Sequence, residues 1–139
     1  MKFENSIYFN QLKHQKVVFP FGTYYLFDNY IIAEHTEGIH FDWPEIKQIS
    51  DYLIEFYGPN LKIGHITNRI NHYSIDPNLW IKFNKEYGFV IASAIVIYDD
   101  FGYRNATLEK QFSTNSIKRC TSLEEAIYFM QNLKEFKTK

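Results

Sequence analysis

The feature of this sequence that most constrains its fold is an apolar run from Phe89 to Tyr98, which is interrupted only by Ser93. The run is shorter than the roughly 20 apolar residues of a membrane span, and it shows no alternation of apolar and polar residues. A run of this length, rich in β-branched residues, is typical of a strand that is covered on both faces. We therefore expect a central strand here, with covering helices on both sides.

Helix start signals occur at three places along the chain, and a fourth helix is predicted without one. The clearest is Asp42, which precedes Pro44 and lies three residues before Glu45, as an N-cap residue does. The helix that begins there should end at Gly58 and bury one apolar stripe, made of Ile46, Ile49, Leu53 and Phe56. The other predicted helices follow Asp76-Pro77, span Tyr103 to Phe112, and follow the capping box Ser122-Leu123-Glu124-Glu125.

Extended segments alternate with these helices. The aromatic and β-branched run Val17 to Phe27 is broken by Pro20 and Gly22 and ends at the turn pair Asp28-Asn29. A second extended run, Tyr30 to Glu34, follows, and the two runs predict an antiparallel hairpin. Short strands are expected over Lys62 to Thr67 and over Ser116 to Cys120. The order predicts an α/β fold in which an N-terminal hairpin is followed by repeated strand-helix units, with a mostly parallel central sheet of about five strands and about four helices.

The length of the chain favours one domain. Its 139 residues match the roughly 100 to 150 residues of a common domain, and the sequence contains no linker and no internal repeat. We expect a single domain over residues 17–139. Residues 1–16 show no clear period, and they are predicted to form an arm or an extra strand.

The predicted element order and the segment Ile117 to Ala126 resemble the STAS and SpoIIAA-like superfamily, which includes Sec14-like lipid-binding relatives. The segment consists of a short strand, the helix-capping residue Ser122, two acidic residues and an alanine-containing amphipathic helix. The resemblance covers residues 17 to 136. It implies the SpoIIAA-like superhelix of strands and helices. It also implies an interaction module or small-ligand module without chemistry of its own.

One stretch departs from that resemblance. The anti-sigma antagonists of the family carry an Asp-x-Ser phosphorylation motif after the strand that corresponds to Lys62 to Thr67, and no such motif occurs from Thr67 to Pro77. The phosphoserine switch and the sigma-factor partner are therefore not expected here. The stretch is more similar to the short STAS/Sec14-like branch of the group, which implies no particular reaction.

The polar loop Asn68 to Asp76 is the first candidate site. In parallel α/β folds ligands bind at the carboxyl ends of the strands, where this loop should meet Thr36 to Gly38 and Asp99-Asp100. A ligand-binding role is predicted for Asn68, Arg69, Asn71, His72, Tyr73 and Ser74. The guanidinium of the loop offers a planar fork to a carboxylate or phosphate. The alternative is that Asp76 only caps its helix and that the other polar side chains satisfy loop backbone groups.

Asp99 and Asp100 form the second candidate site. Paired acids after a central strand hold Mg²⁺ or accept a phosphoryl group in receiver-type folds, so they are predicted as an anion or metal pocket. Together with Arg69 they would make the chain a small phosphate- or divalent-ion-dependent enzyme or phosphoacceptor. The structural alternative is that Asp99 pairs with an arginine or caps the next helix.

The histidines and the cysteine give weaker signals. His35, His40 and His65 lie near predicted strand ends, but no His-x-x-x-His or His-Glu-x-x-His spacing supports a metal site. Cys120 has no nucleophile signature around it, and no serine lies in a Gly-x-Ser-x-Gly motif. We therefore expect no catalytic residue, no metal ligand and no cofactor.

The charge balance and the cysteine count narrow the classes of partner. Fifteen basic and sixteen acidic residues give a net charge of -1, which argues against nucleic acid as a partner. A single cysteine allows no intrachain disulfide and fits a cytoplasmic location. The segment Met1 to Ser6 lacks the pattern of a signal peptide, and no membrane span is expected.

Aromatic residues make up 19% of the chain, well above ordinary usage. Several of them are predicted to line a pocket for a lipid-like or flat ligand, to fill the core or to form a dimer interface: Tyr24, Tyr25, Phe27, Tyr30, Trp43, Tyr73 and Trp80. Because neighbours in a strand face opposite sides, some hairpin aromatics should point away from the core. The sequence thus favours a non-catalytic module that binds a partner protein or a small apolar or anionic ligand, with a homodimer as a further hypothesis.

Overall fold

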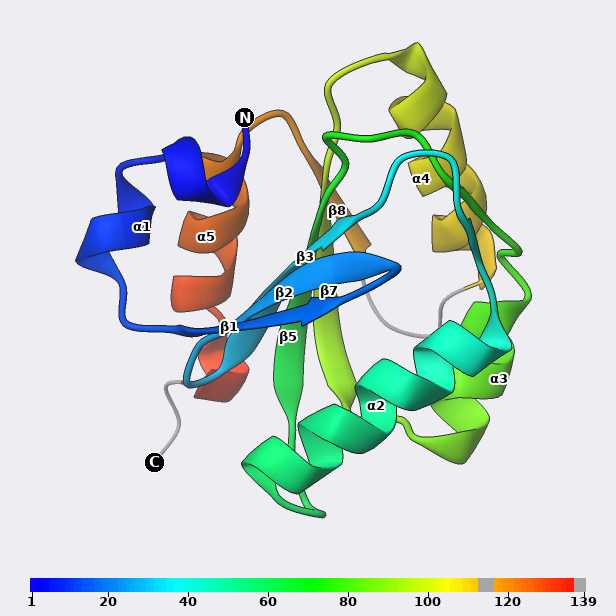
Figure 1. Cartoon of the computed structure of the whole chain (residues 1–139), viewed down its shortest axis with the longest axis horizontal. Helices are drawn as coiled ribbons and strands as arrows, with labels where there is room; N and C mark the ends of the chain where they lie inside the picture. Colours follow the sequence, from blue (N-terminus) through cyan, green and yellow to red (C-terminus); the bar gives the residue numbers. More distant parts are fainter. Residues whose placement is uncertain (113–116, 137–139) are drawn as a thin grey trace.

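A six-stranded mixed sheet organises the chain (Figure 1). The computed structural model describes residues 1–112 and 117–136. Strands β1 to β3 are antiparallel to one another, and β3, β5, β7 and β8 are parallel, in the spatial order β1-β2-β3-β5-β7-β8. The strands of this sheet are β1 (Gln15–Phe19), β2 (Gly22–Leu26), β3 (Tyr30–His35), β5 (Ile63–Asn68), β7 (Val90–Val96) and β8 (Ile117–Cys120).

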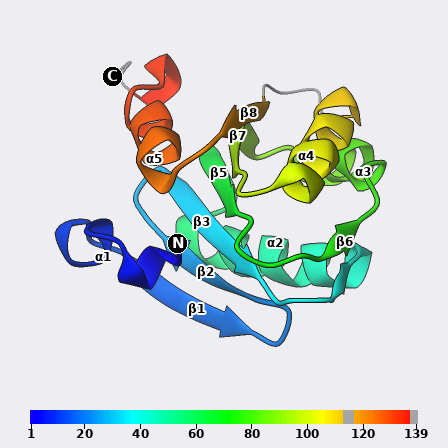
Figure 2. The same cartoon turned by 90° about the horizontal axis from the view of Figure 1, so that it is seen from above.

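Helices cover both faces of the sheet. Figure 1 shows α1 and α5 on one side and α2 and α3 on the other, and Figure 2 shows the same layers from above. The helices are α1 (Tyr8–Gln11), α2 (Trp43–Tyr57), α3 (Leu79–Glu86), α4 (Asp100–Phe112) and α5 (Leu123–Gln131), with 3-10 turns at Phe3–Asn5 and Lys134–Phe136. The predicted α/β class, the N-terminal hairpin and the parallel strand-helix units are therefore confirmed, with six strands in place of about five and one additional short helix, α1.

The extra strand arises because the run from Val17 to Phe27 is not one strand. It divides at Pro20, where the chain turns so that Phe19 pairs with Gly22 in the β1-β2 register. Proline cannot donate to a strand ladder, so it sits in the turn. The predicted turn at Asp28-Asn29 does join two antiparallel strands, β2 and β3.

The apolar run of β7 is covered on both faces, as predicted. Ala94 and Val96 pack in the core under α5, whereas Ile95 packs on the opposite face with Trp80 of α3 and Ala106 of α4. All three side chains in β7 are at most 1% exposed. The alternation of a strand thus divides the interior into two cores, one on each side of the sheet.

The N-terminal segment covers the hairpin face that was expected to be exposed. Phe3 is completely buried, and its ring packs at 4.7 Å from the ring of Tyr25 and at 5.6 Å from that of Phe27. Tyr25 and Phe27 are consequently buried, and so is Tyr30, whose ring stacks on Phe27. The expectation that hairpin aromatics point to solvent is wrong, because residues before β1 form part of the core on that face.

Helix α2 begins where its capping box predicts. The Asp42 carboxylate accepts from the backbone N–H of Trp43, and the Glu45 carboxylate accepts from the N–H of Asp42. Its apolar stripe is buried at Ile46, Ile49 and Leu53, but Phe56 is 44% exposed, so the stripe stops one turn earlier than predicted. In the described residues, we find no helix that is both long and apolar enough to span a membrane.

A second, two-stranded parallel sheet was not predicted. It pairs β4 (His40–Phe41) with β6 (Ser74–Ile75). Strand β6 lies inside the stretch that the sequence indicated as a polar loop. The small sheet joins the segment that follows β3 to the segment that follows β5, at the carboxyl ends of these parallel strands.

Candidate functional site

The three loops that were expected to meet at the carboxyl ends of the strands do meet, and His72 connects them. The backbone N–H of Gly38 donates to the carbonyl of His72 at 2.7 Å, and the N–H of His72 donates to the carboxylate of Glu37 at 3.3 Å. The His72 ring pairs with the Asp99 carboxylate at 2.5 Å. This part of the sequence-based prediction is confirmed.

Beneath these loops lies a cavity of about 90 Å³, which we call the Arg69 cavity. It is bounded by β2, β3 and β5 of the main sheet, by α2, α3 and α4, and by the small β4-β6 sheet. Most of its wall is aliphatic or aromatic. Its polar side chains include Arg69, Glu109, His35, His65 and Tyr73.

Strand alternation at the end of β5 separates two residues that the sequence grouped together. Asn68 points to the α5 side, where its amide donates to the Glu34 carboxylate at 2.7 Å and its carbonyl oxygen accepts from the Tyr98 hydroxyl at 2.6 Å. Arg69 points to the opposite side and lines the Arg69 cavity. Asn68 is thus part of a structural network that also includes the carbonyl of Met1.

The Arg69 side chain is held by a buried ion pair. One Nη atom lies 2.6 Å from the Glu109 carboxylate, and the two side chains are 6% and 2% exposed. The second Glu109 oxygen accepts from the indole N–H of Trp80 at 3.1 Å. The guanidinium also lies over the Tyr73 ring, 4.9 Å from its centroid. Burial raises the pKa of the Tyr73 hydroxyl, which therefore stays protonated at neutral pH.

Two histidines line the same cavity in their neutral form. Burial lowers the pKa of His35 well below its usual value, and the nearby Arg69 lowers it further. The same two causes lower the pKa of His65 to about 4. The ring of His35 bonds to the Tyr24 hydroxyl at 2.8 Å and packs at 4.8 Å from the Tyr73 ring.

Two nitrogen atoms, on residues that line this cavity, are fully buried and have no hydrogen-bond partner among the described residues. They are Nε of Arg69 and Nδ1 of His35. Both residues are at least nine-tenths buried, at 8% and 4% exposure. A buried polar atom without a partner costs free energy, and native proteins rarely leave one unless a ligand or water completes it.

The remaining loop residues have other surroundings. The Asn71 amide donates to the carbonyl of His35 at 3.0 Å, which helps to fix the loop. His72 and Ser74 are exposed, outside the cavity. The six predicted binding residues are therefore divided, with Arg69 and Tyr73 on the cavity wall.

Asp99 and Asp100 are both exposed. Asp99 caps α4, because its carboxylate accepts from the backbone N–H of Gly102 at 2.8 Å. That N–H and the His72 ring lower the pKa of Asp99. Arg69 pairs with Glu109 instead, so the structure does not bring together the three groups of the predicted phosphate or metal site.

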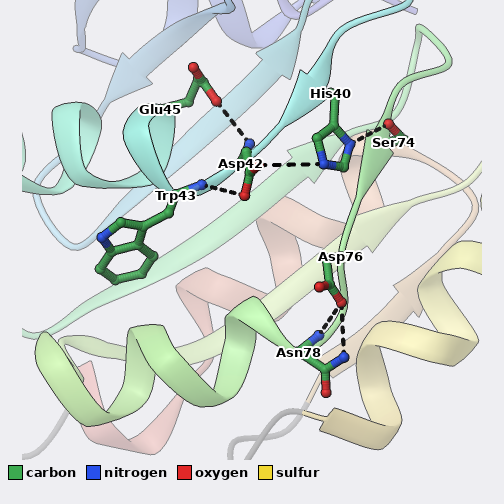
Figure 3. Close-up of polar contacts among 7 residues, drawn as sticks. All are labelled: His40, Asp42, Trp43, Glu45, Ser74, Asp76 and Asn78. Carbon is green, nitrogen blue, oxygen red and sulfur yellow. Dashed lines mark hydrogen bonds and ion pairs between the residues drawn. The ribbon is translucent and has the colours of Figure 1, made fainter.

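A polar cluster at β4 and β6 has the residue types of a Ser-His-Asp triad (Figure 3). His40 Nδ1 lies 2.7 Å from the Ser74 hydroxyl, but His40 Nε2 lies 3.7 Å from the Asp42 carboxylate, which is too long for a hydrogen bond. Asp42 is engaged as the N-cap of α2, and the cluster is exposed. We interpret it as a contact that holds β4 to β6.

Figure 3 also shows the role of Asp76. Its carboxylate accepts from the backbone N–H of Asn78 at 3.0 Å. Helix α3 begins at Leu79, later than the predicted start at Pro77. The N-cap residue of α3 is Asn78, so the prediction that Asp76 caps this helix is wrong, and Asp76 instead fixes the turn before it.

The described residues hold no cluster of three or more His, Cys, Asp or Glu side chains that fits a metal ion. His40 lies on the exposed β4-β6 cluster, apart from the cavity that His35 and His65 line. Cys120 is completely buried, and burial raises the pKa of its thiol to about 11, so it is protonated at neutral pH.

The sequence analysis missed Glu109, the residue that neutralises Arg69. A signal for it exists, since Gly102, Ala106 and Glu109 recur at helical spacing and share the buried side of α4. A glutamate on the buried stripe of a helix requires a partner, because a buried carboxylate without one is very costly.

Comparison of the sequence with protein-family models gives no match, and comparison with curated proteins gives none either. Among solved structures, the fold is similar to the crystal structure of an uncharacterized protein of the DUF3478 family from Shewanella loihica PV-4, which has a SpoIIAA-like fold. The two share 10% sequence identity over 85% of this chain and 92% of that chain, with a TM-score of 0.54. Similarity at this identity shows the fold alone. The chain therefore has a SpoIIAA-like fold, as the resemblance of its sequence implied.

Proposed function

We propose that this chain is a non-catalytic small-ligand-binding domain and that the ligand occupies the Arg69 cavity. The observation that carries this proposal is the mostly apolar cavity itself, which the side chains of Arg69, His35 and Tyr73 also line. Mostly apolar cavities with a few converging polar groups are the usual form of small-molecule sites.

The chemistry of the cavity supports binding over catalysis. Its arginine and glutamate neutralise each other, and burial holds both histidines and the Tyr73 hydroxyl in their neutral forms. No activated nucleophile lies among the described residues that line it. We include a cytoplasmic location in the proposal, because the chain has a single cysteine, which is buried.

The burial of the hairpin aromatics weakens the case for a homodimer formed by them. Tyr24 and Tyr25 are 1% and 2% exposed, so neither is available to a second subunit. Tyr24 instead contributes to the wall of the Arg69 cavity.

The proposal is tested by filling the cavity. Ser50 lies on the inner side of α2, is 2% exposed and lines the cavity, whereas Gln48 is exposed on the same helix. We expect Ser50→Met to occupy the cavity and Gln48→Met to leave it open. The wild-type chain and both variants are screened by ¹H-¹⁵N NMR against a library of small organic compounds.

The expected result is that some compounds shift the amide signals of Thr67, Arg69 and Tyr73 in the wild-type chain and in Gln48→Met, and not in Ser50→Met. Thermal unfolding of each variant establishes that it is folded. A library that shifts none of these signals in the wild-type chain, or equal binding by Ser50→Met, would show that the cavity is not a ligand site.

A further inference from the structure

The N-terminal segment is held to the main sheet through its backbone. The N–H of Phe3 donates to the Glu34 carboxylate at 2.8 Å, and the carbonyl of Met1 accepts from the Asn68 amide at 2.8 Å. Glu34 of β3 and Asn68 of β5 are 8% and 1% exposed, and the Asn68 amide also donates to Glu34 at 2.7 Å. Because both side chains bind main-chain atoms, these contacts are available to any peptide that has an N–H at the position of Phe3.

Two further contacts select side chains. The Phe3 ring is completely buried and packs on Tyr25 and Phe27, with ring centroids 4.7 and 5.6 Å away. The Glu4 carboxylate accepts from the Tyr25 hydroxyl at 2.8 Å and pairs with Lys16 at 2.5 Å. The surface beneath the segment therefore fits a phenylalanine followed by a glutamate. We call this surface the Phe3 site, and it consists of Lys16, Tyr25, Phe27, Glu34 and Asn68.

The other side chains of the segment contribute little to its attachment. Lys2, Asn5 and Ile7 are exposed. Residues 1–7 lie outside the strands of both sheets, and Phe3 is the only buried residue of their 3-10 turn. A segment that is held by one ring and a few polar contacts opens more readily than the strands beneath it. We therefore expect the segment to leave the Phe3 site while the sheet stays folded.

An empty Phe3 site is unfavourable. Without the segment, the buried Glu34 carboxylate loses the N–H of Phe3, and the rings of Tyr25 and Phe27 lose the ring that covers them. A buried carboxylate that lacks a donor and newly exposed aromatic surface both cost free energy. A second peptide of the same chemistry restores both contacts, so the departure of the segment favours its replacement.

We propose that the Phe3 site is a peptide-binding site, which residues 1–5 occupy in cis and which binds a partner protein through a segment with phenylalanine followed by glutamate. The N-terminal segment is then autoinhibitory, because a tethered ligand competes with the partner at a high effective concentration. The Phe3 site lies on the α5 side of the sheet, opposite the Arg69 cavity (Figure 1). The inference therefore does not depend on the proposed function.

The experiment supplies the segment in trans. The probe is a peptide of residues 1–7 with an acetylated and an amidated end, and it is added to three full-length chains at pH 7. They are the wild type, Phe3→Ala, which vacates the ring pocket, and Ile7→Ala, which changes an exposed residue of the same segment. Binding is measured by ¹H-¹⁵N NMR titration, and the signals followed are the Asn68 side-chain amide and the Tyr25 backbone amide.

We expect the probe to bind the Phe3→Ala chain at least about tenfold more tightly than the wild type or Ile7→Ala, in which the segment blocks the site. A probe that carries Phe3→Ala should bind the same chain at least about tenfold more weakly, because it lacks the ring. A probe that carries Glu4→Gln should bind about threefold more weakly, which is the effect of one polar contact. Equal binding of this last probe would overturn the preference for glutamate.

A second variant covers the case in which Phe3→Ala does not fold. Phe3→Leu keeps an aliphatic side chain in the pocket, and we expect it to bind the probe at least about threefold more tightly than the wild type does. Failure of the probe to bind a folded Phe3→Ala or Phe3→Leu chain overturns the inference, and so does equal binding by these chains and the wild type.

Native-state hydrogen exchange of the wild-type chain tests the release of the segment without any variant. We expect the amide of Phe3, which is bonded to Glu34, to exchange at least about 100-fold faster than the slowest amides of β7. Exchange of the Phe3 amide at the same rate as those amides would mean that the segment leaves only when the whole chain unfolds, which overturns the inference.

Discussion

Arg69 and Glu109 form a buried ion pair that joins the end of β5 to α4. The distance between Nη2 and Oε2 is 2.6 Å, and the side chains are 6% and 2% exposed. The two residues are 40 positions apart in the chain, so the pair is a tertiary contact. Because Trp80 of α3 donates to the second carboxylate oxygen, the pair connects one strand with two helices around the cavity.

We predict that Glu109→Gln lowers the free energy of unfolding by about 3 kcal/mol, because it leaves the Arg69 charge buried without a counter-charge. The matched change at an exposed pair is Asp51→Asn, whose partner Lys47 lies at 2.8 Å, and we expect it to lower the free energy of unfolding far less than Glu109→Gln does. Urea unfolding at pH 7 measures both. The double variant Arg69→Gln/Glu109→Gln should recover part of the loss, and equal losses for Glu109→Gln and Asp51→Asn would contradict the prediction.

The parts of the fold that were predicted correctly depend on local signals. The capping residues Asp42 and Ser122 mark the starts of α2 and α5 by hydrogen bonds within one turn, and their side chains do accept from the backbone as expected. The run in β7 has no polar alternation because both of its faces are covered. Such signals can be read from adjacent residues.

The parts that were not predicted depend on contacts between distant segments. Phe3 shows no local period, and its burial follows only from the position of Tyr25 and Phe27 on the hairpin. The β4-β6 sheet consists of two-residue strands, which are too short for a period to appear. Of the candidate site, Arg69 and Tyr73 could be found from the polar loop, whereas Glu109 lies on a helix that gave no loop or cap signal.

The low pKa of His65 predicts that stability falls as the pH falls. Its pKa is about 4 in the folded chain and about 6.5 in an unfolded one, so the unfolded state takes up a proton first between these values. The stabilisation is complete above pH 6.5 and is lost toward pH 4. Because His65 is only half-buried, we expect a loss of about 1 to 3 kcal/mol from this residue.

The measurement is urea unfolding of the wild-type chain and of His65→Asn between pH 7 and pH 4.5. The difference between the two free energies of unfolding should shrink by that amount as the pH falls, and the ¹³C shifts of the His65 ring should titrate near pH 4. A difference that is constant over this range would mean that His65 does not remain neutral in the folded chain.

The burial of Phe3 indicates that the N-terminal segment is part of the folded core. Its side chain is completely buried against aromatic rings, so we expect Phe3→Ala to lower the free energy of unfolding by about 3 to 5 kcal/mol. Ile7 in the same segment is 67% exposed, and Ile7→Ala should cost less than about 0.5 kcal/mol. Urea unfolding compares the two, and similar small effects would show that the segment is undocked in solution.

The close packing around Gly64 predicts that an alanine at this position of the sheet destabilises the chain. A Cβ atom added at this position of β5 would lie 2.3 Å from the sulfur of Met130, which is completely buried in α5. The sulfur has to move, and the surrounding core limits where it can go, so we expect Gly64→Ala to cost about 1 to 3 kcal/mol. Gly102 in α4 is the matched control, because a Cβ there meets its nearest atom at 3.4 Å.

In the control, Gly102→Ala should be neutral or should stabilise the chain by about 0.5 kcal/mol, since alanine restricts the unfolded chain more than glycine does. The same substitution is thus expected to destabilise the chain at Gly64 and not at Gly102. A double-mutant cycle with Met130→Ala tests the cause, because removal of the Met130 side chain makes room for the new methyl group. The cost of Gly64→Ala should fall by at least about 1 kcal/mol in the Met130→Ala background. An unchanged cost in that background would assign the effect to the backbone of β5 and not to this contact.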